Sequence, residues 1–344
     1  MRYLLRRRIT RYVIFSRWTY ALLVLQDKWM KSEACMADIP LKVALDSLDS
    51  RSFSYHLYSV WLFTFSDLKT IVFPKIAFGI STALSGPVLM VNPLPSSLII
   101  CRLPLVAFWI WINLLPFAIN NQRQPKAIEE DKLNKPWRSM PSKRLTPEEA
   151  KILMLIAYPA ALVLSVYLGA TEPSVMLIFF GWVYNELGGA DKSPIIRNLI
   201  NGIGYLSFAS GATIVASGHL LLNEMAYSWL LIIGAVVVTT VQLQDMSDQE
   251  GDSARGRRTV PLVLGDGPAR WTIAVPVMLW SFICPFFWSF AAVGFVLPVA
   301  FGTIVSSRVL LVRTLPGDKL TFKVWNVWMM VLYLMPLLKR WIGW

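Results

Sequence analysis

Long apolar stretches constrain this chain more than any other feature of its sequence. A helix that crosses the hydrocarbon core of a bilayer, about 30 Å thick, needs about 20 apolar residues, and stretches of this kind recur from residue 71 onward. Charged residues make up only 16% of the chain, against about 25% in soluble domains. The sequence therefore predicts an all-α integral membrane bundle of about nine transmembrane helices. The predicted spans are residues 71–92, 97–120, 149–169, 173–189, 196–217, 226–244, 269–287, 289–312 and 321–340.

The basic residues support this topology. With nine spans, the Lys and Arg residues of the loops lie almost entirely on one membrane face, and Arg102, Lys339 and Arg340 are the exceptions. By the positive-inside rule this face is cytoplasmic or its equivalent, and we favour the endoplasmic reticulum over the mitochondrion. The net charge of +12 therefore follows from membrane topology, and no nucleic-acid partner is expected.

The first 50 residues differ from the rest of the chain. They are rich in Arg and contain no acid before Asp27. We interpret residues 1–50 as a basic segment that lies on an anionic lipid surface. A mitochondrial targeting peptide has a similar composition and is the alternative. Residues 51–344 form the predicted transmembrane domain, in which the aromatic segment 52–66 is expected to be an interfacial helix.

An acidic segment follows the sixth predicted span. Asp245, Asp248 and Asp252 are spaced three and then four residues apart, so on a helix they would form one acidic stripe. Their mutual repulsion would raise their pKa values unless a cation lies between them. Only two His and three scattered Cys are present, so no site built from His and Cys is expected. Carboxylate ligands favour Mg²⁺ or Ca²⁺, and Mg²⁺ usually shares its ligand shell with substrate phosphates.

A second acidic segment lies at residues 120–146, after the second predicted span. It contains Asn121, three acids at 129–131, and basic residues that include Arg138. Four spans separate the two acidic segments, so both reach the same membrane face. Acids that hold Mg²⁺ beside Arg and Lys residues that hold phosphate oxygens make a diphosphate site. The apolar bundle next to it suits an isoprenoid tail, which indicates a prenyl diphosphate as the substrate.

Two motifs then give a specific resemblance. The segment after the sixth span reads DMSDQEGDSARGRRTVPLVLG and matches the pattern DxxDxEGDxxxGxxTxPxxLG throughout. The earlier segment reads NQ…EEDKLNKPWRSMPSKRLT, against the pattern NKPxRPxxSGR. With these motifs in this order, the chain resembles the UbiA superfamily of intramembrane prenyltransferases over residues 71–340. The resemblance implies nine helices around a central lipid-open cavity, with both motifs at one mouth and two Mg²⁺ ions that bridge the diphosphate.

The earlier motif departs from the family pattern at three positions. Pro125 stands where the family often has an Asp, and Ser139 and Lys143 replace the Pro and Gly of the pattern's tail. The resemblance therefore leaves open which of the three acids at 129–131 bind metal.

The resemblance assigns roles to individual side chains by their position in the motifs and nearby loops. The metal ligands are Asn121, Glu130, Asp131, Asp245, Asp248 and Asp252. Those also expected to be catalytic are Asp131, Asp245 and Asp248. The diphosphate-binding residues are Arg138, Lys192 and Arg197. Weaker candidates, expected in the cavity, are Trp111, Asn113, Phe117, Trp182, Tyr184 and Asn185.

Two reactions can follow ionisation of the allylic C–O bond on this fold. We favour intramolecular cyclisation of farnesyl or geranylgeranyl diphosphate, because the altered earlier motif with its Trp-containing NKPWR resembles fungal UbiA-type terpene cyclases. The sequence also shows no obvious polar cluster for an aromatic acceptor. Prenyl transfer to such an acceptor is the alternative. A membrane carrier or channel is disfavoured, because the acids cluster at one face. The expected partners are the prenyl diphosphate and the lipid bilayer, without an obligate protein partner.

Overall fold

The computed structural model describes residues 51–218 and 222–342 of the chain. Within these ranges it contains helices and turns but no β-strand, and one isolated bridge joins Met90 and Leu222. This confirms the prediction of an all-α fold. The basic segment predicted at residues 1–50 lies outside the described residues.

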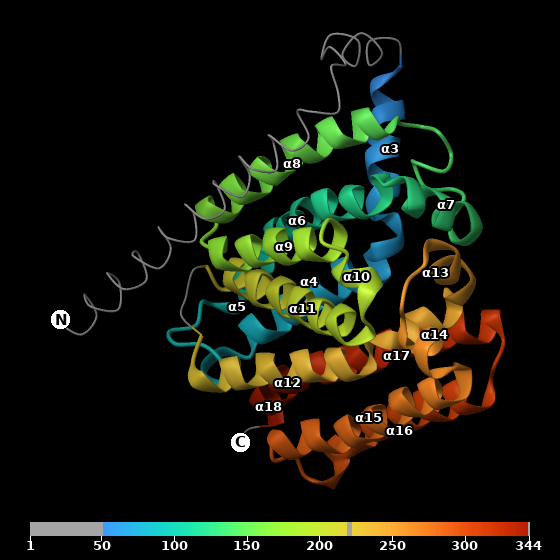
Figure 1. The fold of residues 1–344 in the computed structure, drawn as a ribbon. Helices are drawn as coiled ribbons and strands as arrows, with labels where there is room; N and C mark the ends of the chain where they lie inside the picture. Colours follow the sequence, from blue (N-terminus) through green and yellow to red (C-terminus); the bar gives the residue numbers. More distant parts are fainter. Residues whose placement is uncertain (1–50, 219–221, 343–344) are drawn as a thin grey trace. The chain divides into compact units, whose positions relative to one another are not determined.

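Figure 1 shows the helices packed as one bundle. Most of them run roughly along one direction, and the short helices α7, α10, α13 and α14 lie toward one end of the bundle. In chain order they are α3 (Phe53–Thr64), α4 (Phe73–Leu84), α5 (Ser96–Cys101), α6 (Leu103–Arg123), α7 (Pro125–Asn134), α8 (Pro147–Tyr167), α9 (Thr171–Asn185), α10 (Gly189–Lys192), α11 (Pro194–Ser217), α12 (Glu224–Thr240), α13 (Gln249–Arg255), α14 (Val260–Leu264), α15 (Asp266–Phe287), α16 (Ala292–Leu311), α17 (Leu315–Tyr333) and α18 (Met335–Ile342).

The predicted number of nine spans is not confirmed. Seven helical segments of the described ranges are long and apolar enough to cross a membrane. They include α6, α8, α11, α15 and α16, together with α12 plus its extension to Ser247 and α17 plus α18. The first and fourth predicted spans correspond to α4 and α9, which have only 12 and 15 residues. In α4 the helix ends at Leu84 because Gly86, with a φ of +59°, and Pro87 follow.

Helix α11 lies at the centre of the described bundle. It packs against α4, α6, α9 and α12. Two of its glycines make these close approaches possible, because an added Cβ would overlap the Trp109 ring at Gly211 and the Val238 side chain at Gly202. Small residues allow membrane helices to pack closely in this way. The position of α11 relative to these neighbouring helices is therefore fixed by close packing.

The segment before α4 is irregular. Helix α3 forms where an interfacial helix was expected, and Tyr58 and Trp61 on it are exposed; its position at a membrane surface stays a prediction. The chain then passes through the 3₁₀ helix η1 (Phe65–Asp67) and the π-helix η2 (Leu68–Val72) before α4 begins. Short π segments are frequent at functional sites.

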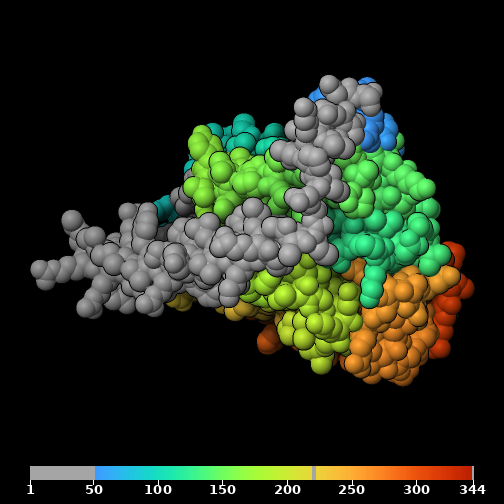
Figure 2. Space-filling view, turned by 45° about the horizontal axis from the view of Figure 1, so that its top comes forward, coloured from blue at the N-terminus to red at the C-terminus, as the bar shows by residue number. Residues whose placement is uncertain are grey.

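The two acidic motifs meet in space. Helix α7 carries the acids of the earlier motif and packs against α13 of the later one. Figures 1 and 2 show the two segments side by side on the surface, with α7 in green and α13 in orange. The predicted convergence of the two motifs on one face of the molecule is therefore found in the structure.

Candidate active site

A cavity of about 190 Å³ lies where the two motifs meet. Its wall is divided into a polar part and an apolar part. The charged residues of the wall are Asp67, Glu130, Lys135, Arg138, Arg197, Asp248 and Arg257. The amides are Asn121, Gln122, Asn201 and Gln244. The apolar and aromatic part includes Leu114, Phe117, Leu177, Phe180, Tyr184, Ile200, Tyr205 and Phe208. Such a wall suits a ligand with an anionic head and a hydrocarbon tail.

Seven of the predicted site residues line this cavity. They come from elements distant in sequence, namely α6, α7, α9, α11 and the loops around α7 and α13. These residues are Asn121, Glu130 and Asp248 among the expected metal ligands, Arg138 and Arg197 among the expected diphosphate ligands, and Phe117 and Tyr184 among the weaker candidates.

Three expected metal ligands lie behind the cavity wall and are bonded to basic residues of the wall. Both carboxylate oxygens of Asp131 accept hydrogen bonds of 3.0 Å from Arg138 Nη1. Asp245 Oδ1 lies 2.8 Å from Arg197 Nη2. The other terminal nitrogen of Arg197, Nη1, donates a hydrogen bond of 2.8 Å to the Tyr184 hydroxyl. These carboxylates hold the guanidinium groups that face the cavity.

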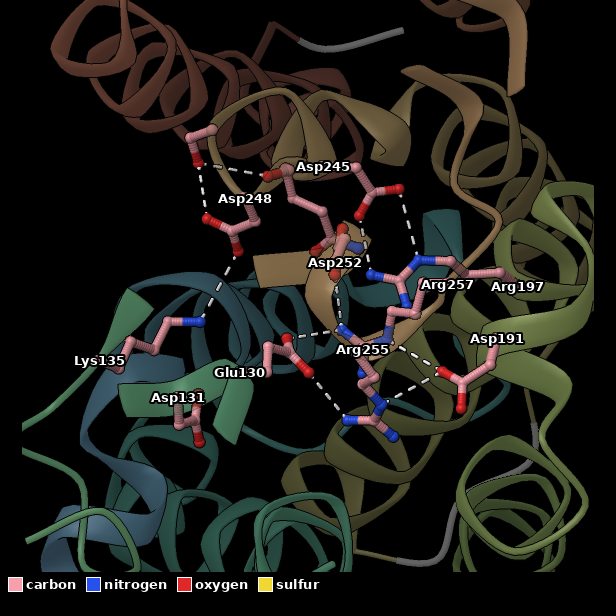
Figure 3. Close-up of polar contacts among 12 residues, drawn as sticks. Glu130, Asp131, Lys135, Asp191, Arg197, Asp245, Asp248, Asp252, Arg255 and Arg257 are labelled. Carbon is pink, nitrogen blue, oxygen red and sulfur yellow. Dashed lines mark hydrogen bonds and ion pairs between the residues drawn. The ribbon is translucent and has the colours of Figure 1, made fainter. Parts of the chain in front are cut away.

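The third of these acids, Asp252, belongs to a larger network. Arg257 Nη1 lies 2.8 Å from both Asp252 Oδ1 and Glu130 Oε1, and Arg255 Nη1 lies 3.0 Å from Glu130 Oε2 (Figure 3). Arg257 Nε also reaches Asp191, in α10, at 3.0 Å. Burial and the nearby Asp245 raise the pKa of Asp252 to about 6, although Arg197 and Arg257 oppose the shift.

The expected acidic stripe on a single helix is not found. Helix α12 tightens into the 3₁₀ helix η4 (Val241–Ser247), which carries Asp245, while Asp248 stands at the break before α13 and Asp252 lies within α13. The three carboxylates have separate basic partners. Asp248 Oδ2 lies 3.8 Å from Lys135 Nζ, and Ser247 Oγ donates to its Oδ1 at 3.0 Å. Their repulsion is therefore relieved by individual ion pairs (Figure 3).

Other candidates lie away from the cavity. Glu129, one of the three acids left open, is 68% exposed and pairs with Lys132. Lys192 is exposed at the end of α10 and does not line the cavity. Asn113 accepts from Ser174 Oγ at 2.6 Å and thereby joins α6 to α9.

The remaining three weak candidates do not line the cavity, and their side chains contact other parts of the bundle. Trp111 Nε1 donates to Thr64 Oγ1 at 3.2 Å. Trp182 packs against Phe179, and Asn185 Nδ2 donates to the Gly181 carbonyl at 3.0 Å within its own helix.

The structure adds site residues that sequence reasoning missed. Asp67, in η1, is half-buried in the cavity wall, and burial raises its pKa against the nearby Arg138 and Lys135. Lys135 belongs to the NKPWR segment, and this motif could have identified it as a site residue. Asp67 is a lone acid that follows an aromatic stretch, and no motif marks it. Nothing in the sequence distinguishes Tyr205 from the other tyrosines of the spans.

The oxygen atoms around the cavity fit a divalent hard cation. Asn121 Oδ1 and Asp252 Oδ2 are buried and have no hydrogen-bond partner, and a buried acceptor without a partner is costly unless a ligand binds it. No group of three or more His, Cys, Asp or Glu among the described residues is placed to hold a metal ion by itself. Mg²⁺ usually takes one or two protein carboxylates and completes its shell with substrate phosphates and water. The oxygen set therefore suits Mg²⁺ bound together with a diphosphate.

Comparisons with known proteins show the family to which the chain belongs. The UbiA prenyltransferase family model matches residues 80–330, and the chain belongs to this family of membrane enzymes. It is 31% identical to fumagillin beta-trans-bergamotene synthase of Aspergillus fumigatus over 228 residues, which are 65% of this chain and 73% of that one. It is 27% identical to somaliensene A/B synthase of Streptomyces somaliensis over 278 residues, covering 78% and 88% of the two chains.

A solved structure shares the fold. It is a UbiA homologue from Archaeoglobus fulgidus bound to DMAPP and Mg²⁺, with a TM-score of 0.53 and 14% sequence identity. The match covers 78% of this chain and 98% of that one. Together with the seven long apolar helices, the family and the fold define a multi-pass membrane enzyme.

Proposed function

We propose that this protein is a Mg²⁺-dependent terpene cyclase that ionises farnesyl or geranylgeranyl diphosphate within the membrane and cyclises the resulting cation. The observation that carries the proposal is the divided wall of the cavity, with cations and oxygen ligands at one part and aliphatic and aromatic side chains at the other. Residues 51–344 form the catalytic domain in this proposal, and the polar part of the cavity faces the cytoplasmic side, with the endoplasmic reticulum favoured.

The basic residues of the wall bind the diphosphate. Arg138, Arg197 and Arg257 present guanidinium groups, and each is held by a carboxylate behind it. Guanidinium groups bind phosphate oxygens in a bidentate manner. Lys135 adds a fourth positive charge at the wall. These four cations stabilise the negative charge that develops on the leaving group as the allylic C–O bond breaks.

The oxygen ligands around the cavity would hold Mg²⁺. Asn121 and Asp248 come from the two motifs and line the cavity. Asp252 lies behind the cavity wall, and its buried Oδ2 has no hydrogen-bond partner. We place Glu130, Asp131 and Asp245 in the same set as residues that bind metal directly or orient the arginines. Bound Mg²⁺ would supply further neutralisation of the departing diphosphate.

The apolar part of the wall protects the cation. Leu114, Leu177 and Ile200 exclude water, so that the cation reacts with a double bond of its own chain. The π faces of Phe117 and Phe180 can stabilise positive charge as it moves along the tail. Attack by a distal double bond forms a carbon–carbon bond, and loss of a proton then gives a cyclic alkene.

Two observations bear on the choice between cyclisation and transfer. The two relatives described above are named as a bergamotene synthase and a somaliensene synthase, and a further relative, 25% identical, is named as a diterpene cyclase. These names support cyclisation. Prenyl transfer is the second candidate, because Gln122 Oε1 and Asn201 Nδ2 belong to residues of the cavity wall and have no hydrogen-bond partner. A polar acceptor molecule could satisfy both atoms.

The test is turnover in a defined membrane. The full chain in lipid nanodiscs is incubated with Mg²⁺ and either farnesyl or geranylgeranyl diphosphate without an acceptor, and the extract is analysed by gas chromatography–mass spectrometry. A cyclic product that is absent from the Asp248→Asn variant supports the cyclase. Prenylated products only after an aromatic acceptor is added would establish the transferase. No consumption of either diphosphate under both conditions would overturn the proposal.

A further inference from the structure

Lys75 is a fully buried lysine in the membrane-spanning bundle. It lies on α4 with 0% of its surface exposed. Its Nζ donates a hydrogen bond of 2.8 Å to the Tyr333 hydroxyl on α17. Over residues 51–218 and 222–342 no carboxylate forms an ion pair with it. Ionisable side chains inside a membrane are costly and often mark a functional site.

Aromatic rings enclose the amine. Nζ lies 4.3 Å from the ring centroid of Tyr205 and 4.7 Å from that of Tyr333, and the Phe78 ring is 6.0 Å away. Phe78 in turn packs edge-on against Tyr333, with centroids 5.1 Å apart. An amine above a tyrosine ring is attracted to its π electrons. The amine therefore joins α4, α11 and α17 through the rings it contacts.

One of these rings belongs to the cavity. Tyr205 lines the apolar part of the wall, directly after Gly204, which also lines it. A Cβ added at Gly204 would meet no atom within 4 Å, so the wall is open beside the Tyr205 backbone. A substrate tail in this part of the cavity can contact the Tyr205 ring, whose position depends on the amine packed against it.

Packing alone gives no reason for a lysine at this place. A methionine has a similar length and would fill the space without the cost of removing an amine from water, since apolar replacements of buried polar groups are often neutral or stabilising. The hydrogen bond to Tyr333 holds the amine in place, and the amine then packs on the Tyr205 ring at 4.3 Å. A flexible thioether would not be held in this way.

We propose that Lys75 is a positioning residue for product specificity, which holds the Tyr205 ring as the wall against which the isoprenoid tail folds. The proposal rests on the proposed function, because it concerns the path of the cation after ionisation. The wall determines which double bond reaches the allylic carbon, and small changes in such contacts shift competing reactions by an order of magnitude.

The experiment compares two variants with wild-type protein in nanodiscs. Lys75→Met removes the amine, and Tyr333→Phe removes only its hydrogen-bond acceptor while it keeps the ring. Released diphosphate and the terpene products are measured in the same reactions. We expect both variants to change the ratio of the two most abundant products by about fivefold or more. Ser81→Ala is the matched control, because Ser81 is buried on the same helix and its hydroxyl donates to the backbone of Tyr333.

Each outcome decides the matter. Changed product ratios in both variants, with an unchanged ratio in Ser81→Ala, support the proposal. An unchanged ratio in either Lys75→Met or Tyr333→Phe, or an equal change in Ser81→Ala, overturns it at any rate of turnover and leaves the proposed function intact. If Lys75→Met does not fold, the ratio in Tyr333→Phe decides, because that variant keeps the ring and nearly the same volume. Absence of turnover in the wild-type protein overturns the proposed function, and this proposal with it.

Discussion

Glu130 and Arg257 form an ion pair of 2.8 Å across 127 residues of sequence. The same Arg257 nitrogen lies 2.8 Å from Asp252, and a second oxygen of Glu130 lies 3.0 Å from Arg255. One carboxylate of the earlier motif is therefore held by two guanidinium groups of the later motif. This network fixes α7 against α13 and places the acids and arginines of both motifs around one cavity.

The first prediction concerns this network. Glu130→Gln is expected to destabilise the protein by about 2 kcal/mol, because two buried arginines lose their charged hydrogen bonds to Glu130 and keep only Asp252 and Asp191 as countercharges. The neighbouring Glu129→Gln is the matched control, since Glu129 is 68% exposed and pairs only with Lys132; exposed pairs of this kind contribute about 0–1 kcal/mol. Thermal unfolding in detergent measures both. Equal melting temperatures for the two variants would show that the network does not hold the motifs together.

The second prediction separates catalysis from folding at Asp248. This side chain is 29% exposed, and its ion pair with Lys135 is long, at 3.8 Å. Asp248→Asn is therefore expected to lower the free energy of unfolding by at most about 1 kcal/mol. Turnover of the prenyl diphosphate is expected to fall by about 10²- to 10³-fold, because the negatively charged carboxylate that would hold Mg²⁺ at the departing diphosphate is replaced by a neutral amide. The rate of diphosphate release and the melting temperature are measured on the same preparation. If Asp248→Asn turns over the prenyl diphosphate at nearly the wild-type rate, Asp248 is not a catalytic residue.

The third prediction is a pH dependence that arises from Asp252. Burial raises the pKa of its carboxyl group to about 6 from 3.8, so the folded protein binds more protons than the unfolded chain between these pH values. The free energy of unfolding of the metal-free protein should therefore fall as the pH rises from about 4 to about 6. Asp252→Asn should remove this contribution. Melting temperatures measured in EDTA over this range, for both proteins, check it.

The same titration affects Mg²⁺ binding. A carboxylate must lose its proton to bind a metal, so stabilisation of the protein by added Mg²⁺ should weaken as the pH falls below about 6. Asp318→Asn serves as a control, because Asp318 is buried in an ion pair with Arg270 away from the cavity. An identical pH dependence in wild type and Asp252→Asn would exclude Asp252 as the titrating group.

The membrane fold could be predicted from the sequence because the bilayer determines two features of it. The thickness of the bilayer sets the length of the apolar segments, and the positive-inside rule sets the distribution of Lys and Arg between the loops. The number of spans could not be predicted in the same way. The chain at 71–92 reads as one apolar run, but α4 stops at Leu84, because the backbone at Gly86 takes a positive φ. Helix α9 is short although its sequence is apolar. Hydropathy averages over a window and does not detect a helix end inside that window.

The site was predictable where it depends on local motifs and was missed where it depends on packing. Asn121, Glu130 and Asp248 line the cavity as their motifs suggested. In contrast, Asp67 reaches the cavity through an irregular 3₁₀ and π segment, and Tyr205 through the packing of α11. The partner of each carboxylate could not be predicted either, because ion pairs such as Asp245 with Arg197 join residues 48 positions apart.

The last prediction tests the cavity wall with two glycines of one helix. Gly204 and Gly211 both lie in α11, but an added Cβ meets no atom within 4 Å at Gly204, whereas at Gly211 it overlaps the Trp109 ring. Gly211→Ala is therefore expected to destabilise the protein by about 1–3 kcal/mol through overpacking. Gly204→Ala should leave stability unchanged or raise it by up to about 1 kcal/mol, because alanine favours a helix. Gly204→Phe should keep the fold and fill the cavity, which lowers turnover of geranylgeranyl diphosphate more than that of farnesyl diphosphate. Thermal unfolding and turnover with both substrates measure these effects, and equal losses of stability in the two alanine variants would contradict an open wall at Gly204.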